Sequence, residues 1–387
     1  MSHPRLNPNI LLSPVENGYI AYDAAQDRLH ELNPVAALIA ELCNGTRTKT
    51  AVRAIAEPFV PDGSSGEIDT WIEDAITAGL LVQDDDVGGP GKVMDAGELS
   101  SLASHLRDHG KIQTAYLCAR RAVELSPDDA EAWCAMAELA HIVGQRQQAR
   151  IGYEKYLESH PDDAEVQHIL TALRDEAPPA RVPDACIQQL YKKFSAFYES
   201  NMVDTLDYQA PQRLGEMLQA VLADRSGLKI LDLGCGTGLS GLRLKPRAAR
   251  LTGVDLSPEM VEHARARAIY DSLHVGEITA WLADCQERYD LIVACDTLIY
   301  FGDLAPVIRA AKSQLSDNGV LAFSVERGAV HPYQLTDSGR YAHHKDSIAA
   351  LAAEAGMELL RLEEGFLRME YGSEVTGLIA AMRKLPG

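Results

Sequence analysis

The chain has 387 residues, 46% hydrophobic and 24% charged, which predicts a folded protein of two or three domains. Its 56 Asp and Glu outweigh 36 Lys and Arg, giving a net charge of −20, and no segment has the basic character that nucleic-acid binding requires. There is no apolar run of membrane-spanning length, no signal-peptide pattern and no C-x-x-C pair among seven scattered cysteines, so we expect a cytoplasmic protein without nucleic-acid or membrane partners or a metal site.

Residues 1–90 predict a winged-helix-like α+β domain. Residues 19–23 and 28–32 alternate in polarity on either side of a plausible turn, which indicates a β-hairpin. Asn33 and Pro34 are suited to start a helix, and apolar residues at helical spacing continue to Leu42. Two further helices are expected over about 48–57 and 68–79, before a linker that reads DDDVGGPG.

Residues 91–178 contain an internal repeat. Gly110 and Gly144 are 34 residues apart, as are Pro127 and Pro161, and SPDDAEAW is echoed by HPDDAEVQ. A 34-residue period of helix pairs is typical of tetratricopeptide repeats, so this segment predicts α-helical repeats of that kind. Two repeats and a partial third are few for a free-standing array, and we expect them to dock on a neighbouring domain.

Residues 179–387 alternate between strand and helix patterns and end in two strands, at about 358–364 and 376–383. This predicts a doubly wound α/β sheet with a late hairpin, which makes the whole chain a multidomain α/β protein. The first strand runs into LDLGCGTG, where Gly234, Gly236 and Gly238 have G-x-G-x-G spacing rather than the dinucleotide-type G-x-G-x-x-G. Asp232 precedes the glycines, and Asp255 ends the second strand.

With LDLGCGTG and GVDLSPEM, the segment from about residue 185 to the end resembles the S-adenosylmethionine-dependent methyltransferases with a Rossmann-like fold. The resemblance implies that Asp232 meets the methionyl amino group, directly or through water, and that Asp255 binds ribose. The other implied cofactor residues are Gly234, Cys235, Gly236, Leu256, Glu277 near adenine, and Asp296 near the donor methyl or the acceptor. An NAD enzyme and a turn that binds nothing are the alternatives.

The segment YKKFSAFYES, before the first strand, contains Tyr191 and Phe197. It fits either an amphipathic helix packed on the sheet or a lid that places aromatic rings near a sulfonium cation. Together, FSAFYESNMVDTLDYQAP and CDTLIYFGDL resemble a methyltransferase group that often carries tetratricopeptide repeats.

The acceptor is less constrained by the sequence. The fourth strand is followed by CDTLIY and not by a motif of the Asn/Asp-Pro-Pro-Tyr type, which argues against a nucleobase or amide nitrogen as the methyl acceptor. We favour a carboxylate oxygen. Arg340 with the nearby histidines could hold an acidic acceptor, or His343 could act as a base. The candidate acceptor-side residues are Asp296, Tyr300, Glu326, Arg340, Tyr341, His343 and His344.

With its hairpin, ELNPVAALIAELCNG and the ending TWIEDAITAGLL, the segment 8–83 resembles the PqqD-like domains, which recognise the leaders of ribosomally made, modified peptides. The resemblance implies that a leader adds a strand to the edge formed by Arg28, Leu29, His30 and Leu32, against the helix that carries Ile68, Trp71 and Ile72. We therefore expect a methyltransferase that modifies a captured precursor peptide and works with other peptide-modifying enzymes. A small-molecule O- or N-methyltransferase and a scaffold with a vestigial cofactor site are the alternatives.

Overall fold

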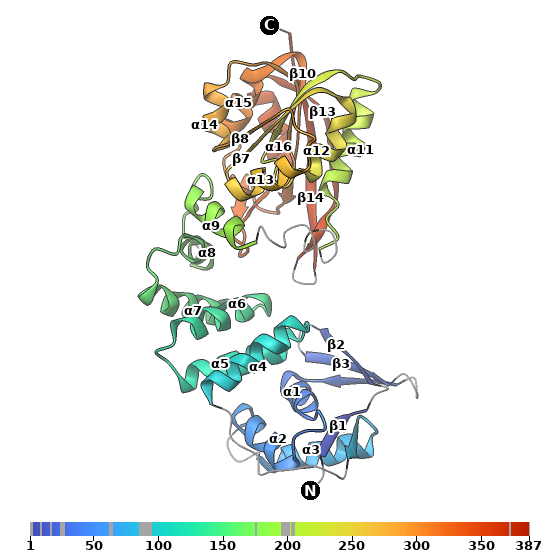
Figure 1. Ribbon diagram of the computed structural model, residues 1–387, viewed down its shortest axis with the longest axis vertical. Helices are drawn as coiled ribbons and strands as arrows, with labels where there is room; N and C mark the ends of the chain where they lie inside the picture. The colour runs from blue at the N-terminus through green and yellow to red at the C-terminus, as the bar shows by residue number, and fades with distance from the viewer. Residues whose placement is uncertain are drawn as a thin grey trace. The chain divides into compact units, whose positions relative to one another are not determined.

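The computed structural model describes residues 3–7, 10–15, 18–23, 28–61, 65–84, 95–174, 176–194, 202, 206–370 and 373–386. The chain divides into two compact units, Met1–Pro161 and Asp162–Gly387, and each is described here by itself (Figure 1). The predicted domain limits of 1–90, 91–178 and 179–387 remain predictions. None of the described helices is both long and apolar enough to cross a bilayer.

The first unit begins with two small antiparallel sheets. Strands β2 (Ile10–Val15), β3 (Gly18–Asp23) and β4 (Arg28–Leu32) pair in that order, so the expected hairpin forms and β4 is an edge strand. The pair β1 (His3–Leu6) and β5 (Leu81–Asp84) joins the two ends of this region. The helices between them are α1 (Pro34–Leu42), α2 (Lys49–Ala56), the short 3-10 turn η1 (Glu57–Phe59) and α3 (Ser65–Thr77).

The cap of α1 forms as its sequence predicts. Asn33 accepts a hydrogen bond from Ala36 N at 2.8 Å, and Pro34 occupies the first turn. Ile68 and Ile72 of α3 are fully buried and belong to the core, whereas Trp71 is half-buried.

Two helical hairpins follow in the first unit, α4 (Ala96–Asp108) with α5 (Ile112–Leu125) and α6 (Ala130–Ile142) with α7 (Arg146–Ser159). Asp95 and Glu98 close α4 with a reciprocal capping box, and Asp129 caps α6. Gly152 of α7 lies so close to α6 that a Cβ there would come within 2.8 Å of Ala137. Small residues therefore set the spacing of this helix pair.

The helical hairpins are joined to the N-terminal sheets through α5, which packs on α1. Lys111 forms an ion pair with Glu41, and the Thr114 hydroxyl lies 3.4 Å from that of the buried Tyr19. These contacts join α5 to α1 and β3 within the first unit.

The second unit starts with α8 (Ala164–Leu173) and α9 (Asp184–Phe194), which pack on each other. Its principal sheet has the order β8-β7-β6-β9-β10-β14-β13, in which β14 is antiparallel to β10 and all strands before it are parallel. The strands are β6 (Leu228–Leu233), β7 (Ala248–Asp255), β8 (Ser272–Val275), β9 (Tyr289–Ala294), β10 (Leu315–Arg327), β13 (Met357–Glu370) and β14 (Ser373–Lys384). Short strands β11 (Tyr333–Leu335) and β12 (Tyr341–His343) extend the end of β10.

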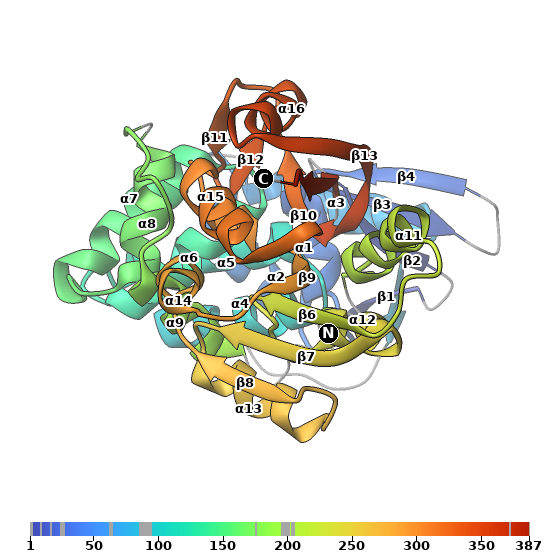
Figure 2. The same cartoon turned by 90° about the horizontal axis from the view of Figure 1, so that it is seen from above.

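Helices cover both faces of this sheet, as a doubly wound fold requires (Figure 2). One core packs α14 (Ile278–Asp284), α15 (Ala305–Gln314) and α16 (Lys345–Glu354) on the sheet, and the other packs α11 (Ala210–Leu222) and α12 (Leu239–Leu244). Helix α13 (Pro258–Ala266) lies along β7 and β8, and 3-10 turns η4 (Lys245–Arg247) and η5 (Leu298–Tyr300) follow α12 and β9. The late hairpin is present, with strands longer than the sequence predicts.

Candidate methyl-donor and acceptor sites

The glycine loop between β6 and α12 depends on backbone conformations that side chains disfavour. Gly234 and Gly236 have φ values of +65° and +53°. A Cβ at Gly234 would come within 2.2 Å of the Thr297 hydroxyl, whereas a Cβ at Gly236 would meet nothing within 4 Å. The first glycine therefore lets β6 and the β9 loop approach each other, and the second leaves open space beside the backbone.

Asp255, at the carboxyl end of β7, fixes this loop. Its Oδ2 accepts a hydrogen bond from Gly236 N at 2.8 Å, and its Oδ1 accepts one from Ser257 N at 2.9 Å. Burial raises the pKa of this carboxyl group, and the backbone hydrogen bonds oppose that rise. Each carboxylate oxygen retains a further lone pair, so Asp255 can also accept hydrogen bonds from a ligand hydroxyl.

Asp232 is completely buried behind the loop. Its Oδ2 accepts hydrogen bonds from Ser240 Oγ at 2.8 Å and from the Tyr270 hydroxyl at 2.7 Å, while its Oδ1 has no partner. Desolvation raises the pKa of Asp232 to about 6. An unpartnered buried carboxylate oxygen favours a donor, from a ligand or a water, that the protein itself does not supply.

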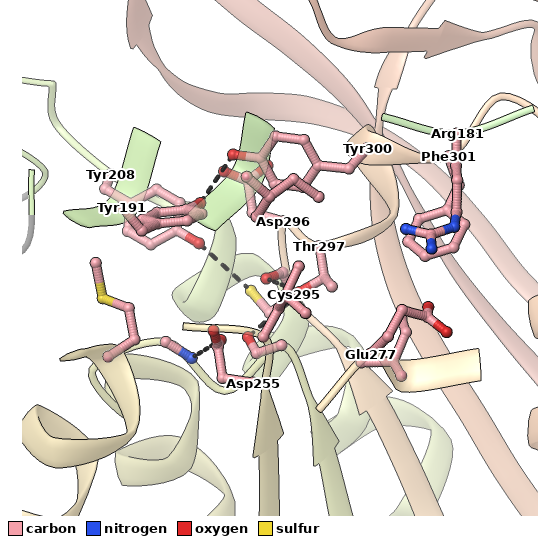
Figure 3. Close-up of a pocket in the computed structure, with 16 residues that line it drawn as sticks. Arg181, Tyr191, Tyr208, Asp255, Glu277, Cys295, Asp296, Thr297, Tyr300 and Phe301 are labelled. Atoms are coloured by element: carbon pink, nitrogen blue, oxygen red, sulfur yellow. Dashed lines mark hydrogen bonds between the residues drawn. The ribbon is translucent and has the colours of Figure 1, made fainter. Parts of the chain in front are cut away.

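A first cavity opens above the loop and contains most of the predicted cofactor residues (Figure 3). Its apolar wall includes Leu256, Met260 and Ile278. Its other lining residues are Arg181, Ile187, Tyr191, Tyr208, Gly234, Gly236, Asp255, Glu277, Cys295, Asp296, Thr297, Tyr300 and Phe301. The described lining includes neither Asp232 nor Cys235, and Phe197 lies outside the described residues.

Two of the predicted cofactor residues, Glu277 and Cys235, are also held in place by the fold itself. Glu277 caps α14 by accepting hydrogen bonds from Thr279 N and Ala280 N, at 3.0 and 2.8 Å. The Cys235 thiol is buried, and desolvation with the nearby carboxylates raises its pKa well above the usual value. A thiol that stays neutral is a poor nucleophile, and no neighbouring residue in the sequence would activate it.

Tyr191 of α9 and Tyr300 of η5 line this cavity and also a second one. Their hydroxyls are 2.8 Å apart, and their rings meet edge to face (Figure 3). Burial raises the pKa of Tyr300, which keeps this hydroxyl protonated. The second cavity measures about 360 Å³ and shares Ile187 and Asp296 with the first.

The second cavity is bounded by α8 and α9 on one side and by η5, residues 338–340 and β13 on the other. His168 of α8 is buried, and its Nε2 lies 2.9 Å from the carbonyl oxygen of Gly339, next to Arg340. Burial lowers the pKa of His168, so the neutral ring can donate this hydrogen bond. Helix α8 thereby helps to position the segment that carries Arg340.

A cluster of five charged side chains lies at the second cavity, of which Arg368 and Glu326 are buried and Asp296, Arg340 and Glu370 are partly buried. Arg368 donates to both oxygens of Asp296 at 3.1 Å, pairs with Glu326 and lies 3.5 Å from Glu370. Arg340 forms an ion pair with Glu370. Asp296 itself has a φ of +54°, a conformation that costs a non-glycine residue about 1 kcal/mol or more and is often retained at functional sites.

Three of the predicted acceptor-side residues support the fold. His343 is buried, its Nε2 lies 3.1 Å from the Gly302 carbonyl oxygen, and burial lowers its pKa to about 4. It lines neither cavity, so its position does not support the role of base. His344 caps α16, and the Tyr341 hydroxyl donates to the Pro179 carbonyl oxygen at 2.6 Å.

The structure adds site residues that the sequence analysis missed. Tyr270 and Ser240 hold Asp232, and Arg368 and Glu370 complete the charged cluster. Arg368 and Glu370 are two residues apart in β13, so they share one face of the strand. This spacing is the sequence signal that could have placed them in one site.

Comparison with known proteins agrees with this geometry. Residues 224–365 match the family model described as a methyltransferase domain. The chain is 36% identical over 105 residues to malonyl-[acyl-carrier protein] O-methyltransferase of Acetivibrio thermocellus, covering 27% of this chain and 37% of that one. It is also 36% identical over 91 residues to magnesium-protoporphyrin O-methyltransferase of Rhodobacter capsulatus, covering 22% and 39%. The chain thus spans less than half the length of these two relatives.

A longer match is to ubiquinone biosynthesis O-methyltransferase of Bordetella pertussis, 24% identical over 52% of this chain and 90% of that one. A similar solved structure is magnesium protoporphyrin IX methyltransferase from Synechocystis with bound S-adenosylmethionine, at 20% identity and a TM-score of 0.35, covering 44% and 78% of the two chains. The sheet order and the glycine loop agree with the family match: residues 224–365 resemble a methyltransferase domain.

Proposed function

We propose that the chain transfers a methyl group from S-adenosylmethionine to an oxygen atom of a peptide that its N-terminal unit captures. The observation that carries the methyl-transfer part is the hydrogen bond from Gly236 N to Asp255, which holds the glycine loop open beside the first cavity. Oxygen as the target is supported by the relatives named above, which are O-methyltransferases.

The residues of the first cavity suit this cofactor. Gly236 leaves open space, the Asp255 carboxylate has lone pairs for ribose hydroxyls, and the buried Asp232 Oδ1 lacks a donor. Glu277 and the apolar Leu256 would be adjacent to the adenine. When bound, S-adenosylmethionine supplies a methyl group on a positively charged sulfur atom, already activated for displacement.

The chain's own contribution is then positioning and exclusion of water. Tyr191, Tyr300 and Asp296 line both cavities and are the groups that an acceptor would meet as it approaches the donor. The faces of Tyr191 and Tyr300 can stabilise a nearby sulfonium charge. Asp296, held by Arg368 at 3.1 Å, presents its carboxylate in a fixed orientation.

The N-terminal unit supports a peptide as the acceptor. We propose that its first part is a PqqD-like leader-binding domain with a winged-helix-like fold. We also propose that α4–α7 are two tetratricopeptide-like repeats, which α8 of the second unit follows as a partial third. Among the described strands, β4 pairs with β3 alone, so its other edge can accept an added strand, and Leu29 on it is 69% exposed. Such capture would raise the local concentration of the acceptor without new contacts at the catalytic unit.

The sequence analysis favours a carboxylate oxygen, and Arg340 lines the second cavity, but it is already paired with Glu370 there. A small-molecule acceptor is the second candidate, because the second cavity can hold a small ligand without the N-terminal unit.

The test incubates the full chain with S-adenosylmethionine and a precursor peptide encoded beside its gene, and detects a gain of 14 Da by mass spectrometry. We expect methylation of the precursor and a much slower reaction on the same peptide without its leader. Equal rates on both peptides would contradict leader capture. Failure of the protein to bind S-adenosylmethionine in calorimetry would contradict the enzymatic assignment.

A further inference from the structure

We infer that the second cavity is the acceptor site and that it selects an uncharged hydroxyl group, as in a phenol or an alcohol, and rejects a carboxylate. This inference rests on the proposed methyl transfer and specifies its acceptor. The cavity shares Tyr191, Tyr300 and Asp296 with the first cavity, so a group bound in it can reach the donor side.

The charges around the cavity argue against an anionic acceptor. Asp296, Glu326 and Glu370 supply three carboxylates, while Arg340 and Arg368 supply two guanidinium groups. The remaining acidic lining residue, Glu165, is neutralised by Lys193 at 2.9 Å. The groups described at this cavity therefore have a net charge of about −1, and both arginines already have carboxylate partners.

Protonation of Glu326 would not reverse this preference. Burial raises the pKa of this carboxyl group, and a neutral Glu326 would bring the cluster to charge balance. A substrate carboxylate would still add an unpaired negative charge to a buried site, or would have to displace Glu370 from Arg340. Either event costs binding free energy that a hydroxyl group avoids.

The remaining walls fit an apolar body that ends in a hydroxyl. Ile169, Cys186, Leu190 and Ile299 come from α8, α9 and η5, and Val182, Met202 and Leu206 extend this surface. Because Ile169 and His168 are on α8, a helix of the repeat-like segment forms part of the acceptor site.

A hydroxyl acceptor gives a balanced step. Its oxygen forms a bond to the methyl carbon while the carbon–sulfur bond breaks, leaving the neutral thioether S-adenosylhomocysteine. The hydroxyl proton passes to the Asp296 carboxylate and from there to solvent. Asp296 is the carboxylate that lines both cavities.

The test uses the full chain saturated with S-adenosylhomocysteine and a matched pair of probes, 4-ethylphenol and 4-ethylbenzoate, titrated by ligand-observed NMR. We expect the phenol to bind at least about tenfold more tightly. Glu370→Gln removes one negative charge and should shift the ratio of benzoate to phenol affinity several-fold in favour of the benzoate. Ile169→Trp should fill the cavity and abolish phenol binding, whereas Leu125→Trp, on the exposed face of α5, should not.

Equal or tighter binding of the benzoate would overturn the charge preference. Absence of binding by both probes, or unchanged binding in Ile169→Trp, would overturn the assignment of the cavity. Calorimetry with S-adenosylhomocysteine separates the proposed function from this inference. If S-adenosylhomocysteine does not bind, the proposed function is contradicted rather than this inference.

Discussion

The hydroxyls of Tyr191 and Tyr300 lie 2.8 Å apart, and both side chains line the two cavities of the C-terminal unit. One tyrosine comes from a helix that precedes the sheet and the other from the turn after its fourth strand in chain order. This hydrogen bond ties α9 to the carboxyl edge of the sheet.

Replacing Tyr300 with Phe should remove this hydrogen bond and keep the ring. We expect kcat to fall about three- to tenfold and the free energy of unfolding to fall by no more than about 1 kcal/mol, because one hydrogen bond is worth about 1 kcal/mol. Steady-state methylation and circular dichroism melts measure both effects. Tyr333→Phe, on β11 and outside the lining of both cavities, is the matched control and should behave as wild type. An unchanged kcat in Tyr300→Phe would remove the pair from the mechanism.

Asp255→Ala should weaken binding of S-adenosylhomocysteine at least about tenfold, because Gly236 N loses its acceptor and the ligand hydroxyls lose theirs. Isothermal calorimetry measures the affinity. Asp290→Ala is the control, since Asp290 also accepts a backbone hydrogen bond, from Lys229 N at 2.9 Å, but at the amino-terminal ends of β6 and β9. Similar losses in both variants would mean that Asp255 acts only through general stability.

Asp232 should make the protein less stable as the pH rises. Its pKa of about 6 in the folded protein exceeds the usual 3.8, so the folded state binds more protons than the unfolded state between these values. The free energy of unfolding falls by about 3 kcal/mol as the pH rises from below 3.8 to above about 6. Urea unfolding at pH 4.5 and pH 8 should show a stability gain of Asp232→Asn over wild type that is much larger at pH 8. A gain that does not change with pH would contradict the shifted pKa.

Arg368→Ala should strongly destabilise the C-terminal unit, by about 3–5 kcal/mol, because Asp296 and Glu326 would be left as buried carboxylates without their partner. Arg383 offers a comparison in the neighbouring strand β14, since its pair with Glu358 is exposed and its removal should cost less than about 1 kcal/mol. Thermal melts measure both changes. A small effect of Arg368→Ala would mean that the cluster stays compact without its central cation.

Leu29→Asp tests the edge strand β4. The side chain is 69% exposed, so the substitution should leave the fold intact while placing a charge where a leader strand would pack. We expect the KM for the full precursor to rise at least tenfold and the rate on a leaderless peptide to stay the same. Leu125→Asp, at an exposed site on α5, should change neither value. A normal KM in Leu29→Asp would place leader recognition elsewhere.

The arrangement around the glycine loop, the candidate cofactor site, could be predicted because its parts are close in sequence. Asp232, the three glycines and Asp255 fall at the carboxyl ends of adjacent parallel strands, where the fold brings them together. The ends of these strands can be located from the hydrophobic runs in the sequence.

The acceptor half could not be predicted in the same way. Arg368 is 72 residues from Asp296 and reaches it only because the terminal hairpin returns β14 beside β10, with β13 at its side. The histidines after Arg340 suggested a base, but His343 turned out to satisfy the Gly302 carbonyl group in the core. Local pattern cannot distinguish a buried structural imidazole from a reactive one.

The boundary between the two compact units falls at Pro161, between α7 and α8, and not after the last repeat-like helix. This boundary decides where the N-terminal unit can be exchanged for that of another protein. A chimera that imports a different N-terminal module should be joined at this boundary, because a graft at residue 178 would also replace the helix that carries His168 and Ile169. If the N-terminal unit binds the leader as proposed, a graft at this boundary would exchange leader recognition and keep α8 in the lining of the second cavity.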